Sequence, residues 1–315
     1  MANAAYKGLK GLYRKGHHTA LRGLNAMGFN VALTKDFYSA MPVLSELKAS
    51  RDLWDRPSEL VGVSYELESI KQRLAQLVSH YGAEYEALPS YEEKKAMKIG
   101  PGFTLVDLMV LYMTLRDIKP RKYVEIGSGF STYYAWLAIE KNREEGVDCD
   151  FRVVDPFPRD PLKELPNVEV RGVRAETVEL DYFTSLEAGD VLFIDTTHVL
   201  KIGGEVAFLY LEVVPRLAPG VTIHAHDIHF PYNAPHPAET YILDAKWPGY
   251  WTEAMLLQAF LAFNPEFEIV MSTPIIRHFD DEFLDRTLPD YQRLSIENYD
   301  THHGSLWMQR VARGG

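Results

Sequence analysis

The chain has 315 residues and a formal net charge of −11, which excludes general nucleic-acid binding through bulk electrostatic attraction. Its hydrophobic (46%) and charged (24%) fractions are ordinary globular values, so the length allows one large domain with an extension or two small domains. The single cysteine, Cys149, excludes an intrachain disulfide and favours a reducing compartment, for which we expect the cytoplasm. No apolar run is long enough to span a membrane, since Asp107 interrupts the best candidate, and the N-terminus lacks the continuous apolar core of a signal peptide.

The first 35 residues are basic and amphipathic, and the first acidic residue is Asp36. Such a segment on an acidic chain could make peripheral contact with an anionic membrane surface or bind an acidic partner. Its five glycines weaken an isolated helix, which favours the alternative that its apolar stripe packs on the main domain or on a second subunit of a homodimer. The basic residues are Lys7, Lys10, Arg14, Lys15, Arg22 and Lys35.

The segment that follows is predicted to be helical with interruptions. Apolar side chains recur mostly at steps of three and four over 64–81, which predicts an amphipathic helix that Ser64 could cap. We interpret residues 1–100 as a helical N-terminal extension that forms either a lid over an active site or a dimer contact. Pro101-Gly102 then marks the boundary of a second domain, 101–315.

From this boundary onward, predicted strands and helices alternate, which indicates an α/β domain with a parallel sheet covered by helices on both faces. Thr104 is expected to cap the first helix, which runs through Arg116. Strands are predicted over 123–126, 151–155, 168–173, 191–195, 221–226, 267–271 and 306–311. Further helices are predicted over 131–143, 205–217 and 252–264.

A glycine turn after the first predicted strand is the clearest feature of a ligand site. The strand Tyr123–Ile126 ends in Gly127-Ser128-Gly129, and a helix is predicted to start at Ser131, so a ligand could approach the backbone closely. Thr132 stands where a dinucleotide fingerprint needs its third glycine, and no Gly-Lys-Ser/Thr follows, which argues against NAD, FAD and a P-loop. A strand–turn–helix without any ligand stays the alternative.

Glu125 lies inside this otherwise apolar strand, so we expect its carboxylate to accept backbone N–H groups or to hold a cationic ligand group. The Glu-x-Gly-x-Gly pattern resembles motif I of the class I S-adenosylmethionine-dependent methyltransferases, and the order of elements over 101–315 is similar to theirs. The resemblance implies a Rossmann-like doubly wound sheet of seven strands, the last inserted antiparallel between the fifth and sixth, with S-adenosylmethionine as cofactor. The cofactor site that it implies comprises Glu125, Gly127, Ser128, Gly129, Ser131, Asp155, Glu176 and Asp195.

Two of these positions have local alternatives. Ligands of open α/β sheets bind outside the carboxyl ends of the strands, where Asp155 ends the second predicted strand. The resemblance implies that Asp155 binds the ribose hydroxyls of the cofactor, whereas an Asp before Pro156 could simply initiate a turn. Glu176 stands where the family often contacts adenine, but it could also be the solvated start of a helix.

The fourth predicted strand ends in Asp195, and His198 follows three residues later, so both side chains can face one site. Histidine is the natural general base near neutral pH. The Asp-x-x-His pattern resembles O-methyltransferases in which this His is the base and this Asp helps to hold a divalent metal. The alternative is that His198 only caps the following loop.

The fifth predicted strand ends in His224-Ala-His226-Asp227-Ile-His229. Metal-dependent relatives carry an acidic pair here, whereas this chain has His226-Asp227. A possible metal site formed by Asp195, His226 and Asp227 therefore suits Mn²⁺, Fe²⁺ or Zn²⁺ better than Mg²⁺. Without a metal, Asp227 and these histidines could bind and orient the substrate.

The resemblance as a whole implies a bacterial enzyme that methylates an oxygen of a small molecule or sugar, with His198, Asp195 and Asp227 at the reacting end. The stretch 231–250, rich in proline, histidine and aromatic residues, could form the acceptor wall or be a packed surface loop. Two other functions stay open. One is a metal-dependent hydrolase that uses His224, His226, Asp227 and His229, although their spacing differs from that of known hydrolase ligand sets, and the other is a non-catalytic S-adenosylmethionine-binding protein.

Overall fold

The computed structural model describes residues 19–29, 31–32, 34, 37–91, 93, 96–100 and 103–311. Most of the basic residues of the N-terminal segment, and the predicted boundary at Pro101-Gly102, lie outside the described residues. The chain divides into two compact units, Met1–Arg51 and Asp52–Gly315. In the first unit, residues 19–26 and α2 (Leu44–Ala49) are helical.

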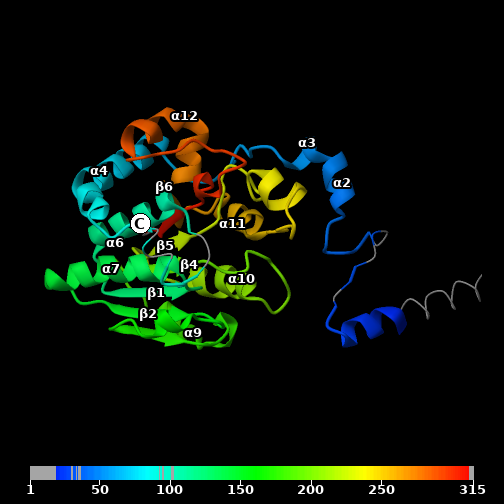
Figure 1. Ribbon diagram of the computed structural model, residues 1–315, viewed down its shortest axis with the longest axis horizontal. Helices are drawn as coiled ribbons and strands as arrows, with labels where there is room; N and C mark the ends of the chain where they lie inside the picture. Colours follow the sequence, from blue (N-terminus) through cyan, green and yellow to red (C-terminus); the bar gives the residue numbers. More distant parts are fainter. Residues whose placement is uncertain are drawn as a thin grey trace, which may run out of the picture. The chain divides into compact units, whose positions relative to one another are not determined.

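The second unit contains a seven-stranded sheet within its described residues, in the order β3-β2-β1-β4-β5-β7-β6 (Figure 1). The strands β1 to β5 pair in parallel, whereas β7 pairs antiparallel with both β5 and β6. The predicted doubly wound sheet with its last strand inserted antiparallel between the fifth and sixth is therefore confirmed. The strands are β1 (Lys122–Ile126), β2 (Asp150–Val154), β3 (Val168–Arg171), β4 (Val191–Ile194), β5 (Thr222–Ala225), β6 (Phe267–Ser272) and β7 (Leu306–Arg310).

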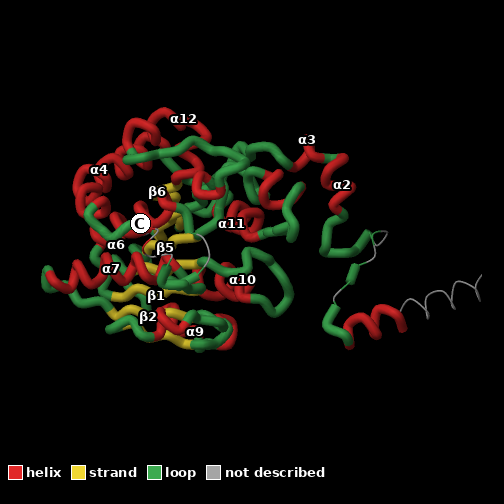
Figure 2. Tube along the Cα trace, viewed as in Figure 1, coloured by secondary structure: helices red, strands yellow, loops and turns green. Residues whose placement is uncertain are grey.

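Helices lie around this sheet, as Figure 2 shows with strands in yellow and helices in red. The connection from β1 to β2 contains one helix. The connection from β4 to β5, which runs in the opposite direction across the sheet, contains another. Because both crossovers are right-handed in nearly all proteins, the two connecting helices cover opposite faces. The helices are α3 (Arg51–Trp54), α4 (Leu67–Glu86), α6 (Leu105–Ile118), α7 (Phe130–Glu144), α8 (Asp160–Lys163), α9 (Leu180–Thr184), α10 (Glu205–Phe208), α11 (Glu253–Leu261) and α12 (Thr273–Thr287).

The most buried helix is α6, which packs against both α4 and α7. Thr104 caps it as predicted, since its hydroxyl accepts the backbone N–H of Asp107 at 3.2 Å. Arg116 near its end is buried and joins the three helices, because it donates to Glu84 of α4 at 2.6 Å and to Glu145 after α7 at 2.5 Å. This contact packs α4, which lies in the predicted N-terminal extension, against α6 and α7.

Two expected helices differ from the structure. The predicted cap Ser64 is not a cap, because its carbonyl accepts the N–H of Ile269 in β6 at 2.9 Å, which keeps it extended and delays the start of α4 to Leu67. The helix predicted over 205–217 is not continuous. It passes from α10 into a π-helical turn, η2 (Leu209–Val213), and a 3₁₀ turn, η3 (Val214–Arg216), where Pro215 lacks the N–H that a continued helix needs.

Candidate active site

A cavity of about 520 Å³ opens at the carboxyl ends of β1, β2 and β4, where the strand order reverses direction. Its wall includes the glycine turn after β1, the residues that follow β2, and η1 (Ala175–Thr177). The cavity gathers five of the predicted cofactor residues, namely Gly127, Ser128, Asp155, Glu176 and Asp195. The other three predicted cofactor residues, Glu125, Gly129 and Ser131, are not among the side chains that line it.

Gly127 is required by the approach of β1 to β4. Its φ is +87°, and a Cβ atom at this position would lie 1.9 Å from the carbonyl oxygen of Asp195. The N–H of Asp195 in turn donates to the carbonyl of Ile126 at 2.9 Å. The backbone of the glycine turn after β1 is therefore in direct contact with the backbone of Asp195 at the end of β4.

Glu125 is completely buried in β1 and serves the start of α7. One carboxylate oxygen accepts the hydroxyls of Ser131 (2.6 Å) and Thr132 (3.0 Å), and the other has no hydrogen-bond partner among the described residues. The expectation of backbone N–H partners is thus replaced by hydroxyl partners. Thr132, at the position of the missing third glycine, also accepts the N–H of Gly129 at 3.0 Å and so caps α7.

Asp155 follows β2 and lines the cavity, and the turn that is one of its two predicted roles is present. One oxygen accepts the N–H of Phe157 at 2.7 Å, which forms the predicted turn, and the other accepts the hydroxyl of Ser128 at 2.5 Å. A carboxylate can accept further hydrogen bonds, so the turn does not exclude a ribose. Glu176 lies in η1, lines the same cavity and pairs with Arg174.

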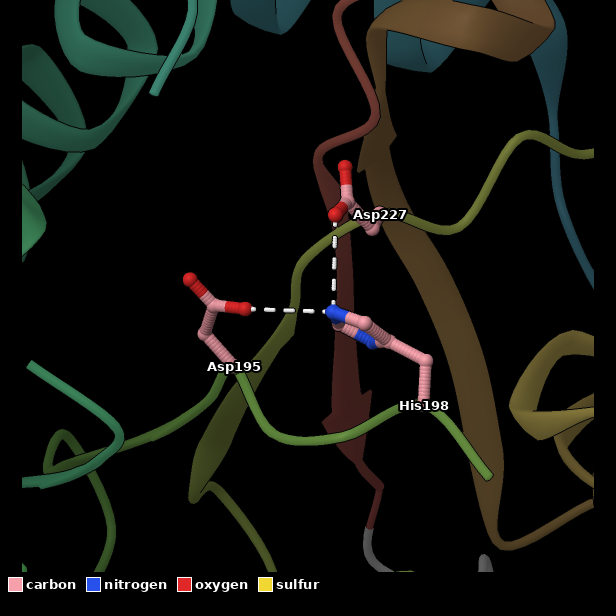
Figure 3. Close-up of side chains that lie close together, drawn as sticks. All are labelled: Asp195, His198 and Asp227. Atoms are coloured by element: carbon pink, nitrogen blue, oxygen red, sulfur yellow. Dashed lines mark ion pairs between the residues drawn. The ribbon is translucent and has the colours of Figure 1, made fainter. Parts of the chain in front are cut away.

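Asp195, His198 and Asp227 come together beside this cavity. The Nε2 atom of His198 lies 3.3 Å from Asp195 Oδ1 and 3.4 Å from Asp227 Oδ2, so the ring points between the two carboxylates (Figure 3). One ligand atom from each of the three residues lies within 4.8 Å of the others. Asp195 contacts the cavity and the histidine alike, which joins the two parts of the site.

The backbone at this centre is held in an unfavourable conformation. His198 has φ +58° and Asp227 has φ +56°, in the left-handed region that side chains other than glycine rarely adopt. Such residues cost roughly 1–3 kcal/mol each and concentrate at functional sites. The neighbouring carbonyl of His198 accepts the N–H groups of Thr252 (2.8 Å) and Glu253 (3.1 Å), which holds it in place.

His226 approaches the same acids from the other side. Its Nδ1 lies 3.5 Å from Asp195 Oδ2 and 3.7 Å from Asp227 Oδ1. Its Nε2 lies 3.3 Å from Asp107, and its ring stacks on Phe103 with centroids 3.9 Å apart. Asp107 is itself fully buried and also accepts the N–H of Ser305 at 3.0 Å.

The four residues of the hydrolase alternative do not form one cluster. His224 stacks on Trp307 at 4.1 Å, and its Nε2 is 3.0 Å from the hydroxyl of Ser305. His229 instead packs against Tyr241, with ring centroids 5.3 Å apart. His226 and Asp227 of this set contact Asp195 or His198, whereas His229 lines a small pocket together with His198 and Asp227.

Residues 124–228 match a protein-family model described as a methyltransferase domain. This match indicates a methyltransferase domain over residues 124–228 of the chain. An uncharacterized protein of Archaeoglobus fulgidus is 25% identical over 161 residues, which cover 48% of this chain and 72% of that protein.

The methyltransferase domain is also similar to solved structures, at low identity. One is the O-methyltransferase TomG from Streptomyces achromogenes in complex with SAM, with 14% identity, 85% of this chain and 96% of that chain covered, and a TM-score of 0.42. Another is an O-methyltransferase from Bacillus cereus in complex with SAH, with 15% identity, 85% and 97% covered, and a TM-score of 0.37.

The charged groups of the candidate site shift one another's pKa values. Burial lowers the pKa of His198, but hydrogen bonds with Asp195 and Glu253 outweigh it and raise the pKa to about 10. Burial raises the pKa of Asp195, but His226 and His198 outweigh this effect and hold the pKa below its ordinary value. Burial raises the pKa of Glu125 to about 8. At neutral pH, His198 is therefore an imidazolium between carboxylates.

Three residues that support this centre are not predicted from the sequence. Glu253 was seen only as part of a helix start, Asp107 only as a break in an apolar run, and Tyr210 not at all. An acidic residue in an otherwise apolar helix was the one available signal, since a buried carboxylate needs partners.

None of the helices in the described part of the chain has the length and apolar character that spanning a membrane requires.

Proposed function

We propose that this methyltransferase domain transfers a methyl group from S-adenosylmethionine to an oxygen of a small molecule or sugar, with His198 as the general base. The observation that carries the proposal is the position of Asp195. It lines the cavity at the strand-order reversal and lies 3.3 Å from the Nε2 of His198. A donor in that cavity and a base beside it are the two parts that methyl transfer to a hydroxyl requires.

The cavity residues fit the polar parts of the cofactor. Asp155 offers its free acceptor positions to the ribose hydroxyls, and Glu176 lies further along the same wall. Gly127 and Ser128 line the same cavity, so the turn after β1 offers its backbone to the ligand. Asp195 also lines the cavity, so its negative charge would attract the sulfonium of a bound donor.

The reaction then needs one proton transfer. The hydroxyl of the acceptor gives its proton to Nε2 of His198 as its oxygen attacks the methyl carbon. The carbon–sulfur bond of a bound donor would break at the same time, with S-adenosylhomocysteine as the neutral thioether leaving group. Because the pKa of His198 is raised to about 10, the ring must first lose a proton. The positive sulfonium beside Asp195 favours that loss, since a nearby cation lowers the pKa of an imidazolium.

Among the described residues, the ligand atoms that lie within 4.8 Å of one another belong to Asp195, His198 and Asp227, whereas the predicted metal set has His226 in place of His198. A divalent metal held by Asp195, His226 and Asp227 would lie beside this base. His226 presents Nδ1 to both acids at 3.5 and 3.7 Å, and Asp107 holds its other nitrogen, as carboxylates commonly do for metal-bound histidines. A metal bound there would lower the pKa of the acceptor hydroxyl. His198 would then keep Nε2 free for the proton, whereas metal bound by His198 itself would remove the base.

The cytoplasm is our proposed compartment, because the single cysteine leaves no disulfide to form. Burial raises the pKa of Cys149 to about 12, so its thiol stays protonated and takes no part in the proposed chemistry.

The test is calorimetric titration of the protein with S-adenosylhomocysteine, before and after treatment with EDTA. We expect micromolar binding that Asp155→Ala weakens at least about tenfold, a loss of roughly 1.4 kcal/mol. Asp160→Ala is the matched control, since Asp160 pairs with Lys163 on α8 and does not line the cavity. Binding that falls after EDTA would support the metal.

Absence of binding from folded protein under both conditions would overturn the methyltransferase proposal. Binding without any turnover across a broad panel of hydroxylated acceptors would instead favour the non-catalytic S-adenosylmethionine-binding protein.

A further inference from the structure

His198 is held by a short segment far away in the sequence, Trp251–Glu253. The backbone N–H groups of Thr252 and Glu253 donate to the carbonyl of His198 at 2.8 and 3.1 Å. The hydroxyl of Thr252 accepts the N–H of Leu200 at 2.8 Å, and the ring of Trp251 lies 4.7 Å from that of His198. The loop after β4 is therefore held through its backbone at His198 and Leu200 and through the ring of His198.

The strongest of these contacts is made by the carboxylate of Glu253, the first residue of α11. Its Oε2 lies 2.9 Å from Nδ1 of His198, and its Oε1 accepts the hydroxyl of Tyr210 at 2.7 Å. All three residues are buried, with exposed fractions of 1% for Glu253, 6% for His198 and 0% for Tyr210. A carboxylate can only accept, so the proton of this contact lies on Nδ1 of the histidine.

We propose that Glu253, held by Tyr210, is a positioning residue that keeps Nδ1 of His198 protonated and Nε2 directed at Asp195 and Asp227. The assignment of a base role to Nε2 rests on the proposed function, but the orientation of the ring does not. Glu253 does not line the cofactor cavity, so its effect on that cavity's ligand is expected to be small.

The geometry explains why an acid is needed at this position. An imidazole ring can rotate and exchange its two nitrogens, and which nitrogen is available depends on the hydrogen bond that the other makes. Once the imidazolium has lost one proton, the two carboxylates at 3.3 and 3.4 Å from Nε2 would keep the remaining ring proton there if Nδ1 had no stronger acceptor. The shorter contact of 2.9 Å to Glu253 retains a proton on Nδ1.

Ring-nitrogen NMR of ¹⁵N-histidine-labelled protein tests this directly, with the His198 signals identified by their loss in His198→Ala. We expect wild-type His198 to show a protonated Nδ1 that exchanges slowly with water. Glu253→Gln keeps an acceptor and should retain the signal, whereas Glu253→Met keeps the shape without an acceptor and should lose it. Tyr210→Phe should leave the signal in place and speed its exchange roughly 10-fold.

Asp190→Asn is the control for loss of a buried carboxylate. Asp190 is 4% exposed and accepts the backbone N–H groups of Lys122 (2.9 Å) and Glu187 (2.8 Å), away from the site. The control should leave the His198 signals unchanged. Calorimetric titration with S-adenosylhomocysteine should give affinities within about twofold of wild type in the Glu253, Tyr210 and Asp190 variants.

An unprotonated Nδ1 in the wild type, or an unchanged His198 signal in Glu253→Met, would overturn the inference. If Glu253→Met does not fold, an unchanged exchange rate in Tyr210→Phe has the same meaning. Loss of S-adenosylhomocysteine binding in the wild type would instead overturn the proposed function, while the NMR result would still decide the role of Glu253.

Discussion

Glu125 is a completely buried residue whose charge affects the stability of the protein. Its pKa is raised to about 8 from 4.5, chiefly by complete burial. Between these two values the native state binds more protons than the unfolded state, so the free energy of unfolding falls as pH rises. Each pKa unit corresponds to about 1.4 kcal/mol, so the loss between pH 5 and pH 8 is large.

Glu125→Gln should remove this dependence, because an amide keeps an acceptor for Ser131 and Thr132 without a titrating proton. We expect the unfolding free energy of the variant to gain several kcal/mol relative to wild type between pH 5 and pH 8, measured by urea denaturation. Asp190→Asn is the control for an acid-to-amide change at a buried position. Parallel curves for wild type and Glu125→Gln would contradict the buried-charge explanation.

The residues of the site that sequence reasoning found are those next to strand ends. Asp155 and Asp195 each end a predicted strand and Asp227 directly follows one, and the topology of a parallel sheet brings such positions to one edge. Glu253 and Asp107 could not be assigned in this way. Glu253 lies 55 positions from His198, and Asp107 lies 119 positions from His226, so only the folded packing shows these pairs.

Among the elements, the turn between β1 and α7 has the least freedom to vary. Gly127→Ala would place a methyl group 1.9 Å from the carbonyl oxygen of Asp195, at φ +87°. The turn and the end of β4 would have to separate, so we expect a loss of roughly 2–4 kcal/mol in unfolding free energy and no detectable S-adenosylhomocysteine binding. Chemical denaturation and calorimetry measure the two effects.

Gly146→Ala separates the two causes, because Gly146 has φ +88° and nothing within 4 Å of its added Cβ. It should lose only about 1 kcal/mol, from backbone strain alone. Equal losses in the two variants would show that the contact with Asp195 relaxes without cost.

The elements were easiest to predict where their pattern was local. Alternating apolar runs and turn residues located all seven strands, and Thr104 capped α6 as expected. Errors arose where tertiary pairing decided the conformation. Ser64 is extended because Ile269 donates to its carbonyl, a partner more than 200 positions away, and no local signal at Ser64 indicates it.

At the scale of the whole molecule, the order of the strands follows from family resemblance rather than from any pattern in the residues. Nothing local in β7 specifies that it lies between β5 and β6. The boundary between the two compact units falls between Arg51 and Asp52, whereas the change in sequence pattern lies near residue 100. The roles of the N-terminal segment as lid, dimer contact or membrane contact stay proposals.

Removal of residues 1–51 separates these roles. In the described part of the chain, every hydrophobic side chain of the buried core lies between Leu60 and Met308, so the unit Asp52–Gly315 holds the whole of that core. We therefore expect the shortened protein to unfold cooperatively, with a midpoint within about 3 °C of the full chain and an S-adenosylhomocysteine affinity within about twofold. Differential scanning calorimetry and isothermal titration measure both values.

The same deletion has a different consequence for each proposed role. A dimer contact predicts that sedimentation shows a dimer only for the full chain, and a membrane contact predicts that only the full chain binds vesicles containing anionic lipid. A lid predicts faster release of S-adenosylhomocysteine with an unchanged oligomeric state, since a cover slows exit of a ligand from a cavity. If the shortened protein fails to fold, residues 1–51 are part of the structural core, and the division at Arg51 does not describe an independent unit.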